Sequence, residues 1–191
     1  EGAKYYIQFI RELSVYARKN KLILSIDNPS YAAYNKFYAR AKQAEVADYI
    51  INMGYDEHYS GSDKGSVASV NFVKSAIEDS LKEVPREKLI NAVPLYTRLW
   101  KKEGGKLSSQ ALGIEASLKW VAEKNLSPKW NEELGQNYVE LISSSESYYM
   151  WLEDEKSLEL KMKLIKENSL AGVAVWRLGL EPSSVWSIIK Y

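Results

Sequence analysis

The sequence of 191 residues contains no cysteine and a single histidine, His58. Disulfides and thiolate metal centres are therefore excluded, and a histidine-rich metal cluster cannot form within one chain. Proteins without cysteine occur in the cytoplasm and also among bacterial secreted proteins, so this absence does not fix the compartment. We expect a protein that uses neither a metal nor another cofactor.

Long apolar runs and an excess of one charge are also missing. No stretch approaches the roughly 20 consecutive apolar residues that a membrane-spanning helix needs. The chain has 26 basic and 25 acidic residues, without long blocks of either sign. Binding to nucleic acid or to an anionic membrane needs a basic surface, so neither is expected as a partner. A neutral partner is favoured.

The sequence also lacks an initiator methionine and a positively charged segment followed by an apolar one. We therefore expect a processed or excised piece of a longer polypeptide. A hydrophobic content of 46% can bury a substantial core, as one domain or as one domain carrying an insertion.

Phenylalanine is scarce, whereas the other aromatic residues are not. There are 3 phenylalanines against 14 tyrosines and 6 tryptophans. Tyrosine and tryptophan combine an apolar ring with a hydrogen-bonding group, which suits a surface that stacks on sugar rings and binds their hydroxyls. Taken alone, this bias is a weak indication of a carbohydrate ligand.

Helical and strand-like segments alternate along the first hundred residues. Apolar residues at helical spacing predict three helices, at 4–20, within 34–45 and at 67–81. Short apolar runs predict three strands, at 22–26, 49–55 and 89–96. We assign residues 1–100 to these repeating units.

The alternation breaks over residues 101–153 and then resumes over 154–191. A Gly104-Gly105 turn, a helix at 114–125 and alternating or aromatic runs at 136–143 and 147–152 predict a small α+β element. Beyond it the pattern predicts a helix at 157–168, a strand at 172–178 and a helix at 183–190. Asp154 or Ser157 is expected to cap the first of these helices and Ser183 the second.

Four strands alternating with helices predict an α/β fold with a parallel sheet. A doubly wound sheet usually carries a glycine-rich phosphate loop, and neither G-x-G-x-x-G nor G-x-x-x-x-G-K-[ST] occurs here. A barrel is favoured instead, but four βα units make only half of an eightfold barrel. Its two open edges must then be covered or paired.

Three of the predicted strands end in aromatic and polar residues. The segments are Met53-Gly-Tyr55-Asp56, Pro94-Leu-Tyr96-Thr-Arg98 and Val175-Trp176. The carboxyl ends of parallel barrel strands meet at one face, where such folds place their chemistry. Three such ends at one face indicate a sugar-binding site.

These strand ends resemble the sixth, seventh and eighth barrel strands of family 18 glycoside hydrolases, the chitinase-like group. The resemblance covers nearly the whole chain, and residues 48–62 and 152–176 are most similar to the bacterial branch that includes spore-cortex peptidoglycan glucosaminidases. It implies the C-terminal half, strands 5–8, of a (β/α)8 TIM barrel, with a small α+β insertion between the last two strands.

The resemblance implies hydrolysis of β-1,4 linkages next to N-acetylglucosamine, in peptidoglycan or chitin. The substrate's own acetamide oxygen then acts as the nucleophile, an exception to the two-carboxylate scheme. That oxygen needs a hydroxyl donor, and the acetamide N–H needs a carboxylate. The resemblance assigns Tyr55 and Asp56 as catalytic, and Met53, Tyr96, Arg98 and Trp176 as substrate-binding. It also implies a location outside the cell, in the cell envelope or at the spore surface.

One part of the family pattern is missing. The family's general acid is a glutamate in a D-x-x-D-x-D-x-E run on the fourth strand, and this sequence contains no such run. Glu1 is a poor substitute because no apolar strand precedes it. The isolated chain is therefore expected to be inactive.

Two classes of function stay open at this point. The chain is either half of an enzyme domain or a non-catalytic, lectin-like member that kept the cleft; release of N-glycans is a third possibility that the same motifs would serve. The expected partners are an N-acetylglucosamine-containing polysaccharide and either a second copy of the chain or the missing N-terminal half-barrel.

Each site residue also has an ordinary structural explanation. Asp56 could cap a helix, Arg98 could pair with Glu57, and the aromatic residues Tyr55, Tyr96 and Trp176 could belong to the core.

Other polar and aromatic residues are expected to be structural. His58 is expected to form hydrogen bonds within a loop, and Trp100, Trp130 and Trp151 to pack in or beside the insertion. The run Glu153-Asp154-Glu155 is interpreted as an acidic first helical turn, which the helix macrodipole favours.

Overall fold

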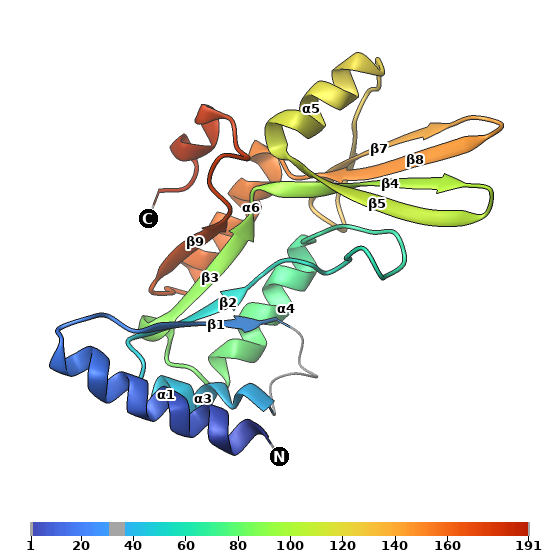
Figure 1. Cartoon of the computed structure of the whole chain (residues 1–191). Helices are drawn as coiled ribbons and strands as arrows, with labels where there is room; N and C mark the ends of the chain where they lie inside the picture. Colours follow the sequence, from blue (N-terminus) through green and yellow to red (C-terminus); the bar gives the residue numbers. More distant parts are fainter. Residues whose placement is uncertain (1, 31–36, 191) are drawn as a thin grey trace.

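The computed structural model describes residues 2–30 and 37–190, which form a parallel sheet covered by helices and an antiparallel sheet that projects from it (Figure 1). The parallel sheet contains four strands in the order β1 (Ser25–Pro29), β2 (Tyr49–Met53), β3 (Leu89–Pro94) and β9 (Gly172–Trp176). All three pairings are parallel. The predicted α/β fold with a parallel sheet is confirmed.

Four helices pack against one face of this sheet. They are α1 (Gly2–Lys19), α3 (Arg40–Ala44), α4 (Val70–Leu81) and α6 (Glu155–Glu167). A single core joins them to the strands, with Ile50 and Leu89 fully buried between the layers. Two short 3-10 helices, η1 (Arg86–Lys88) and η2 (Ser183–Ser187), complete this part of the chain.

The parallel sheet is open. Within residues 2–30 and 37–190, β1 and β9 each pair with one neighbour only, so the strands do not close into a barrel. Alternate residues point to opposite faces of a strand, and Ile51 on the face away from the helices is only half-buried. The family resemblance implies half of a (β/α)8 barrel; these residues form no closed barrel, and the half-barrel assignment stays a prediction.

The first strand lies three residues later than the sequence predicted. The apolar run at 22–26 indicated a strand, but Leu22 and Ile23 are 62% and 74% exposed, and β1 begins at Ser25. Leu22 instead closes the end of α1, since its N–H binds the carbonyl of Ala17 at 2.9 Å. Pro29 fits within β1 because β1 is an edge strand.

The insertion is a five-stranded antiparallel sheet with one helix, α5 (Ile114–Glu123). Its strands are ordered β5 (Lys106–Gly113), β4 (Tyr96–Glu103), β8 (Glu146–Leu152), β7 (Gln136–Ile142) and β6 (Lys129–Asn131). β4 starts two residues after β3 ends, so Tyr96 belongs to this sheet and not to the parallel strand predicted at 89–96. The division of the chain at residues 100 and 153 stays a prediction.

The predicted Gly104-Gly105 turn joins β4 to β5. Both residues have positive φ, +53° and +78°, the conformation that a two-residue hairpin turn requires and that glycine adopts without strain. The predicted helix at 114–125 corresponds closely to α5.

Capping residues explain where the helices begin. Asp154 and Ser157 cap α6 reciprocally, with the Ser157 N–H donating to Asp154 Oδ1 at 3.0 Å and the Asp154 N–H donating to Ser157 Oγ at 2.9 Å. The helix predicted from 67 begins only at Val70, because Ser69 is its cap and accepts from the N–H of Phe72.

Two further helix predictions need correction or qualification. At 183–190 the structure has only the 3-10 helix η2, which ends at Ser187 and receives no cap from Ser183. The start of the helix predicted within 34–45 lies outside the described residues, and α3 accounts for its second part.

Glu153 does not belong to an exposed acidic turn. It is fully buried and accepts a hydrogen bond from Lys161 Nζ at 2.7 Å. Burial raises the pKa of Glu153, and the charge of Lys161 opposes that rise. Lys161 lies about two helical turns along α6 on the same face, so the prediction from the macrodipole missed a buried ion pair.

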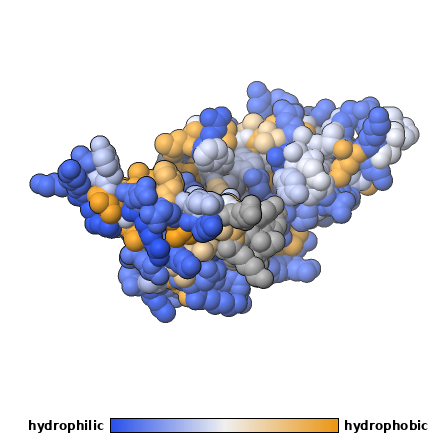
Figure 2. Space-filling view, turned by 60° about the horizontal axis from the view of Figure 1, so that its bottom comes forward, coloured by the Kyte–Doolittle hydropathy of each residue, from blue (hydrophilic) through white to orange (hydrophobic). Residues whose placement is uncertain are grey.

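The part built on the parallel sheet and the antiparallel sheet differ in the hydropathy of their surfaces. Figure 2 shows apolar side chains gathered over the part built on the parallel sheet, whereas the projecting antiparallel sheet is mainly hydrophilic. None of the helices in the described ranges is long and apolar enough to cross a membrane.

Candidate functional site

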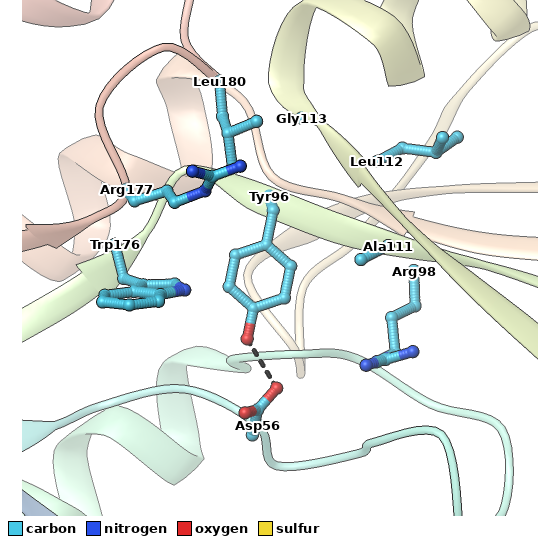
Figure 3. Close-up of a pocket in the computed structure, with 9 residues that line it drawn as sticks. All are labelled: Asp56, Tyr96, Arg98, Ala111, Leu112, Gly113, Trp176, Arg177 and Leu180. Atoms are coloured by element: carbon cyan, nitrogen blue, oxygen red, sulfur yellow. Dashed lines mark hydrogen bonds between the residues drawn. The ribbon is translucent and has the colours of Figure 1, made fainter.

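A cavity of about 340 Å³ lies where the parallel strands end and the antiparallel sheet begins (Figure 3). Four of the six residues that the sequence singled out line it: Asp56, Tyr96, Arg98 and Trp176. They come from the loop after β2, from the start of β4 and from the end of β9. Backbone and side chains of β5 and of the segment after β9 form the rest of the wall.

Asp56 and Tyr96 are joined directly. The Tyr96 hydroxyl donates to Asp56 Oδ1 at 2.5 Å, and Tyr96 is buried. Burial first, and then the hydrogen bond and charge of Asp56, raise the pKa of Tyr96 far above its usual range. The hydroxyl therefore stays protonated and holds one oxygen of the carboxylate in place.

The backbone at Asp56 adopts the left-handed conformation, with φ of +61°. Aspartate tolerates this region better than most residues other than glycine, and such conformations cluster at functional sites. The turn directs the carboxylate toward Tyr96, as Figure 3 shows.

Gly54 allows the loop that carries Asp56 to lie against β3. A Cβ atom at this position would lie 2.7 Å from the carbonyl oxygen of Ala92 and 2.8 Å from Asn91 Nδ2. The Gly54 N–H also donates to that carbonyl at 3.1 Å. Close backbone approach, which only glycine permits here, therefore positions the candidate site.

A row of buried asparagines runs across the parallel strands that lead to the site. Asn28, Asn52 and Asn91 are aligned across β1, β2 and β3 and are buried. Asn52 Nδ2 donates to Asn91 Oδ1 at 2.8 Å, and Asn28 exchanges hydrogen bonds with Gln43 at 2.8 and 3.0 Å. This row could not be predicted from the sequence, because its three members lie far apart along the chain.

Arg98 contributes a cation to the cavity wall. Its Nη1 donates to Ser109 Oγ at 2.9 Å, across the β4–β5 pairing. Its Nε is buried and has no hydrogen-bond partner among the described residues. A buried donor without a partner is costly, which marks Arg98 as a place where an acceptor would be stabilised.

Trp176 ends β9 and is 54% exposed among the described residues. Its carbonyl accepts from the Leu95 N–H at 2.7 Å, and its peptide bond to Arg177 is cis. Like Tyr96, Trp176 lines the cavity (Figure 3).

Tyr55 and Met53 do not line the cavity. Tyr55 contacts Tyr96 edge-on, with ring centroids 6.2 Å apart, and also packs against the main core. Burial, together with the charges of Asp27 and Asp56, raises the pKa of Tyr55 to about 12. Met53 is half-buried at the end of β2, and its carbonyl accepts from Ser30 and Tyr55. The roles assigned to both residues stay predictions.

Asp27, which follows the strand predicted at 22–26, is a further carboxylate near the site. It lies in the middle of β1, and partial loss of hydration raises its pKa. The charge of Asp27 in turn helps to raise the pKa of Tyr55. Ile26 and Asn28, on either side of Asp27, are buried, which is the alternation typical of a strand. A strand predicted three residues later would have included Asp27.

The structure tests the expected helix cap at Asp56 and the expected loop hydrogen bond of His58. Ser69, and not Asp56, caps α4, and Glu57 accepts from the Ser69 N–H at 2.7 Å. His58 forms the expected loop hydrogen bond, from Nδ1 to the Ser66 carbonyl at 2.9 Å.

The tryptophans near the insertion are packed as expected in two cases. Trp100 is completely buried and donates to the Gly65 carbonyl at 2.9 Å. Trp151 packs against Tyr138, with centroids 5.0 Å apart. Trp130 is half-buried, and Lys156 Nζ lies 3.5 Å from its ring centroid.

No group of three histidine, cysteine, aspartate or glutamate side chains that could hold a metal ion occurs within residues 2–30 and 37–190. The polar side-chain groups of the lining residues are one carboxylate, one phenol, one indole N–H and the guanidinium groups of Arg98 and Arg177. Such a set can bind a neutral, hydrogen-bonding ligand and can stabilise charge that develops on it.

Comparison with known proteins identifies the family. The sequence matches the Glycosyl hydrolases family 18 over residues 1–181, and the chain therefore belongs to this family of glycoside hydrolases. It is 30% identical over 197 residues to the glycosylase YvbX of Bacillus subtilis (strain 168), covering 100% of this chain and 57% of that protein. It is 26% identical over 195 residues to the cortical fragment-lytic enzyme of the same organism, covering 97% and 45%.

Solved structures show the same fold. The spore cortex-lytic enzyme SleL of Bacillus megaterium QM B1551 superposes with a TM-score of 0.87 at 21% identity, over 98% of this chain and 45% of that one. A chitinase of Chromobacterium violaceum ATCC 12472 superposes with a TM-score of 0.90 at 21% identity, over 98% and 61%. The chain spans about half the length of the curated relatives it matches.

Proposed function

We propose that this chain is the substrate-orienting part of a glycoside hydrolase that acts on β-1,4 linkages next to N-acetylglucosamine, in peptidoglycan or chitin. The observation that carries the proposal is the hydrogen-bonded pair of Asp56 and Tyr96 in one cavity with the exposed ring of Trp176. A 2-acetamido sugar needs an aromatic surface for its ring and an acceptor for its N–H.

The fold supports a further part of this proposal. We propose that β1, β2, β3 and β9 are strands 5–8 of a (β/α)8 barrel, with the antiparallel sheet as an insertion before the last strand. The open face and edges of the parallel sheet are what such a half would present. Polypeptide that completes the barrel would cover the half-buried side chains on this face.

In the proposed reaction, the acetamide oxygen of the substrate forms a bond to the anomeric carbon while the bond to the leaving oxygen breaks. Positive charge then develops on the acetamide group. The carboxylate of Asp56 accepts the acetamide N–H and stabilises that charge; a carboxylate has lone pairs for this bond in addition to the one from Tyr96. We assign Tyr55 as the hydroxyl donor to the acetamide oxygen.

The remaining residues bind the sugar in this proposal. Trp176 provides the surface on which the sugar ring stacks, and Arg98 provides donors to its hydroxyl or carbonyl oxygens. Met53 contributes an apolar contact below the ring. Each of these roles needs the residue to keep its position at the end of a parallel strand or the start of β4.

The proton donor is proposed to come from outside the described cavity. The leaving oxygen must be protonated, yet Asp56 is the one carboxylate among the residues described as lining the cavity, and it is assigned to the acetamide. The 191 residues contain no D-x-x-D-x-D-x-E run. Glu1 lies outside the described residues. We therefore expect the isolated chain to bind the substrate without hydrolysing it.

Hydrolysis of N-acetylglucosamine oligomers tests this function. In a polypeptide extended to include the acid, Asp56→Asn should lower kcat by about 10²–10³-fold, the loss typical of a group that stabilises developing charge. Asp63→Asn, in an exposed loop, is the control and should leave kcat unchanged. Hydrolysis by the isolated chain that survives Asp56→Asn would refute the assignment.

A non-catalytic, lectin-like role is the alternative. It is favoured by the single carboxylate in the cavity. Binding without hydrolysis by the extended polypeptide would support it. The names of relatives that act on spore cortex lead us to propose the cell envelope or spore surface as the location.

A further inference from the structure

A second cavity, of about 400 Å³, lies on the antiparallel sheet. Its size is within the range of about 300–1,000 Å³ that is typical of small-ligand sites. Its wall includes Leu99, Lys101, Ser108, Gln110, Trp120 and Tyr148. Ser109 and Leu112 complete the wall; Leu112 also lines the first cavity, and Ser109 accepts the hydrogen bond from Arg98.

Apart from Ser109 and Leu112, the strand residues that line the two cavities lie on opposite faces of the same strands. Side chains alternate along a strand, and directly paired residues in an antiparallel sheet share a face. Arg98 and its partner Ala111 line the first cavity, whereas Leu99 and its partner Gln110 line the second. The edge strand β5 forms part of both walls.

An aromatic pair forms the floor of the second cavity. The rings of Trp120, from α5, and Tyr148, from β8, have centroids 5.7 Å apart and are inclined by 53°. Trp120 packs against a small core that includes Val121 and Met150, yet both rings remain half-buried. Rigid, partly exposed rings of this kind offer an apolar surface to one face of a sugar ring.

The lysine in the cavity wall is paired with two carboxylates. Lys101 Nζ lies 2.8 Å from Glu146 and 3.0 Å from Glu103, and 5.7 Å from the ring centroid of Tyr148. One ammonium group therefore faces two carboxylates. The lysine is therefore already paired, and the residues described as lining the cavity offer no free cation to an anionic ligand.

The rim provides neutral hydrogen-bonding groups. Ser108 and Gln110 are exposed on β5, which pairs only with β4 among the described strands. Some backbone N–H and C=O groups of an edge strand point outward without a partner in the sheet. Hydroxyl, amide and backbone groups beside two aromatic rings match the alternating polar and apolar surfaces of a sugar.

We propose that this cavity is a second binding site, which takes one or two rings of a neutral oligosaccharide. The second cavity lies on the face of the sheet opposite Asp56. It would therefore bind one polysaccharide chain while the first cavity binds a neighbouring chain of the same polymer. Two linked weak sites raise the effective concentration of the ligand and keep the protein on an insoluble polymer. The choice of an N-acetylglucosamine polymer as ligand rests on the proposed function.

Titration of the 191-residue chain with a soluble tetramer of β-1,4-linked N-acetylglucosamine tests the proposal by NMR. Each of the six tryptophans has its own indole signal, so Trp120 and Trp176 report on the two cavities separately. We expect the indole signals of both Trp120 and Trp176 to shift. In the Trp176→Ala variant the Trp176 signal is lost, and the Trp120 signal should still shift. A Trp120 signal that stays fixed while the Trp176 signal moves would overturn the second site and leave the first intact.

Variants separate binding from folding. Gln110→Ala, exposed on β5, should weaken the Trp120 response about threefold to tenfold through loss of one or two hydrogen bonds, without unfolding the small core. Leu118→Ala, on the exposed side of α5, is the matched control and should have no effect. Equal responses in both variants would contradict the proposal. If only the Trp120 signal moves, the second site stands and the proposed binding at the first fails.

Discussion

The hydroxyl of Tyr96 donates to Oδ1 of Asp56 at 2.5 Å and so links the first residue of β4 to the loop that follows β2. This contact joins the antiparallel sheet to the carboxyl end of the parallel sheet. The insertion is therefore part of the candidate site, because it supplies the donor that orients the carboxylate.

Tyr96→Phe should weaken the site and the fold together. The change removes a buried hydrogen bond to a charged group, which is worth about 1.5–3 kcal/mol, and frees the carboxylate to rotate. We expect a lower free energy of unfolding by denaturant and weaker binding of N-acetylglucosamine oligomers. Tyr59→Phe, at an exposed tyrosine, is the control. Identical behaviour of the two variants would show that the contact does not matter.

Gly54→Ala should destabilise the chain by about 1–3 kcal/mol, the usual cost of forcing an extra group into a packed site. The added Cβ would meet backbone of β3 at 2.7 Å, which cannot move without shifting a strand. Gly172→Ala is the matched control, since the nearest atom to its Cβ is 3.8 Å away. Chemical denaturation measures both variants, and similar midpoints would contradict the close approach.

Lys161→Met should destabilise the chain by about 3–5 kcal/mol at neutral pH, because it leaves the buried carboxylate of Glu153 without its partner. Lys163→Met, on the exposed side of the same helix, should have little effect. The two variants are compared by denaturation at several pH values.

The pH dependence of the Lys161→Met variant identifies the cause. Burial raises the pKa of Glu153 above its ordinary value of 4.5, and without Lys161 nothing of comparable strength opposes this. Below that ordinary value Glu153 is protonated in both the folded and the unfolded chain, so the penalty is absent. It should grow as the pH rises from there through the raised pKa. A penalty that does not change with pH would point to lost packing instead.

Much of the site was predictable because it depends on a simple rule. Parallel strands end at one edge, so aromatic and polar residues after three apolar runs had to lie near one another. Asp56, Tyr96, Arg98 and Trp176 follow this rule. The position of Tyr55 depends on the turn after Met53, which periodicity does not describe.

Other features could not be predicted because they depend on pairings between distant residues. The row of Asn28, Asn52 and Asn91 becomes visible only once the register of three strands is known. The exposed apolar run at Leu22 and Ile23 was mistaken for a buried strand, since hydrophobicity alone does not show which side of a helix end faces water.

The isolated chain should self-associate or aggregate. β1 and β9 each have an edge without a partner among the described strands, and the face away from the helices leaves apolar side chains such as Ile51 and Ile90 only half-buried. Sedimentation over a range of concentrations should show dimers or larger species. A well-folded monomer at all concentrations would mean that the edges are protected in another way.

A crystal structure of the chain soaked with an N-acetylglucosamine oligomer tests the central claim most directly. We predict a sugar ring against the face of Trp176, with its acetamide N–H donating to the carboxylate of Asp56 and the Tyr96–Asp56 hydrogen bond retained. A sugar bound elsewhere while this cavity stays without one, or an acetamide group turned away from Asp56, would contradict the account.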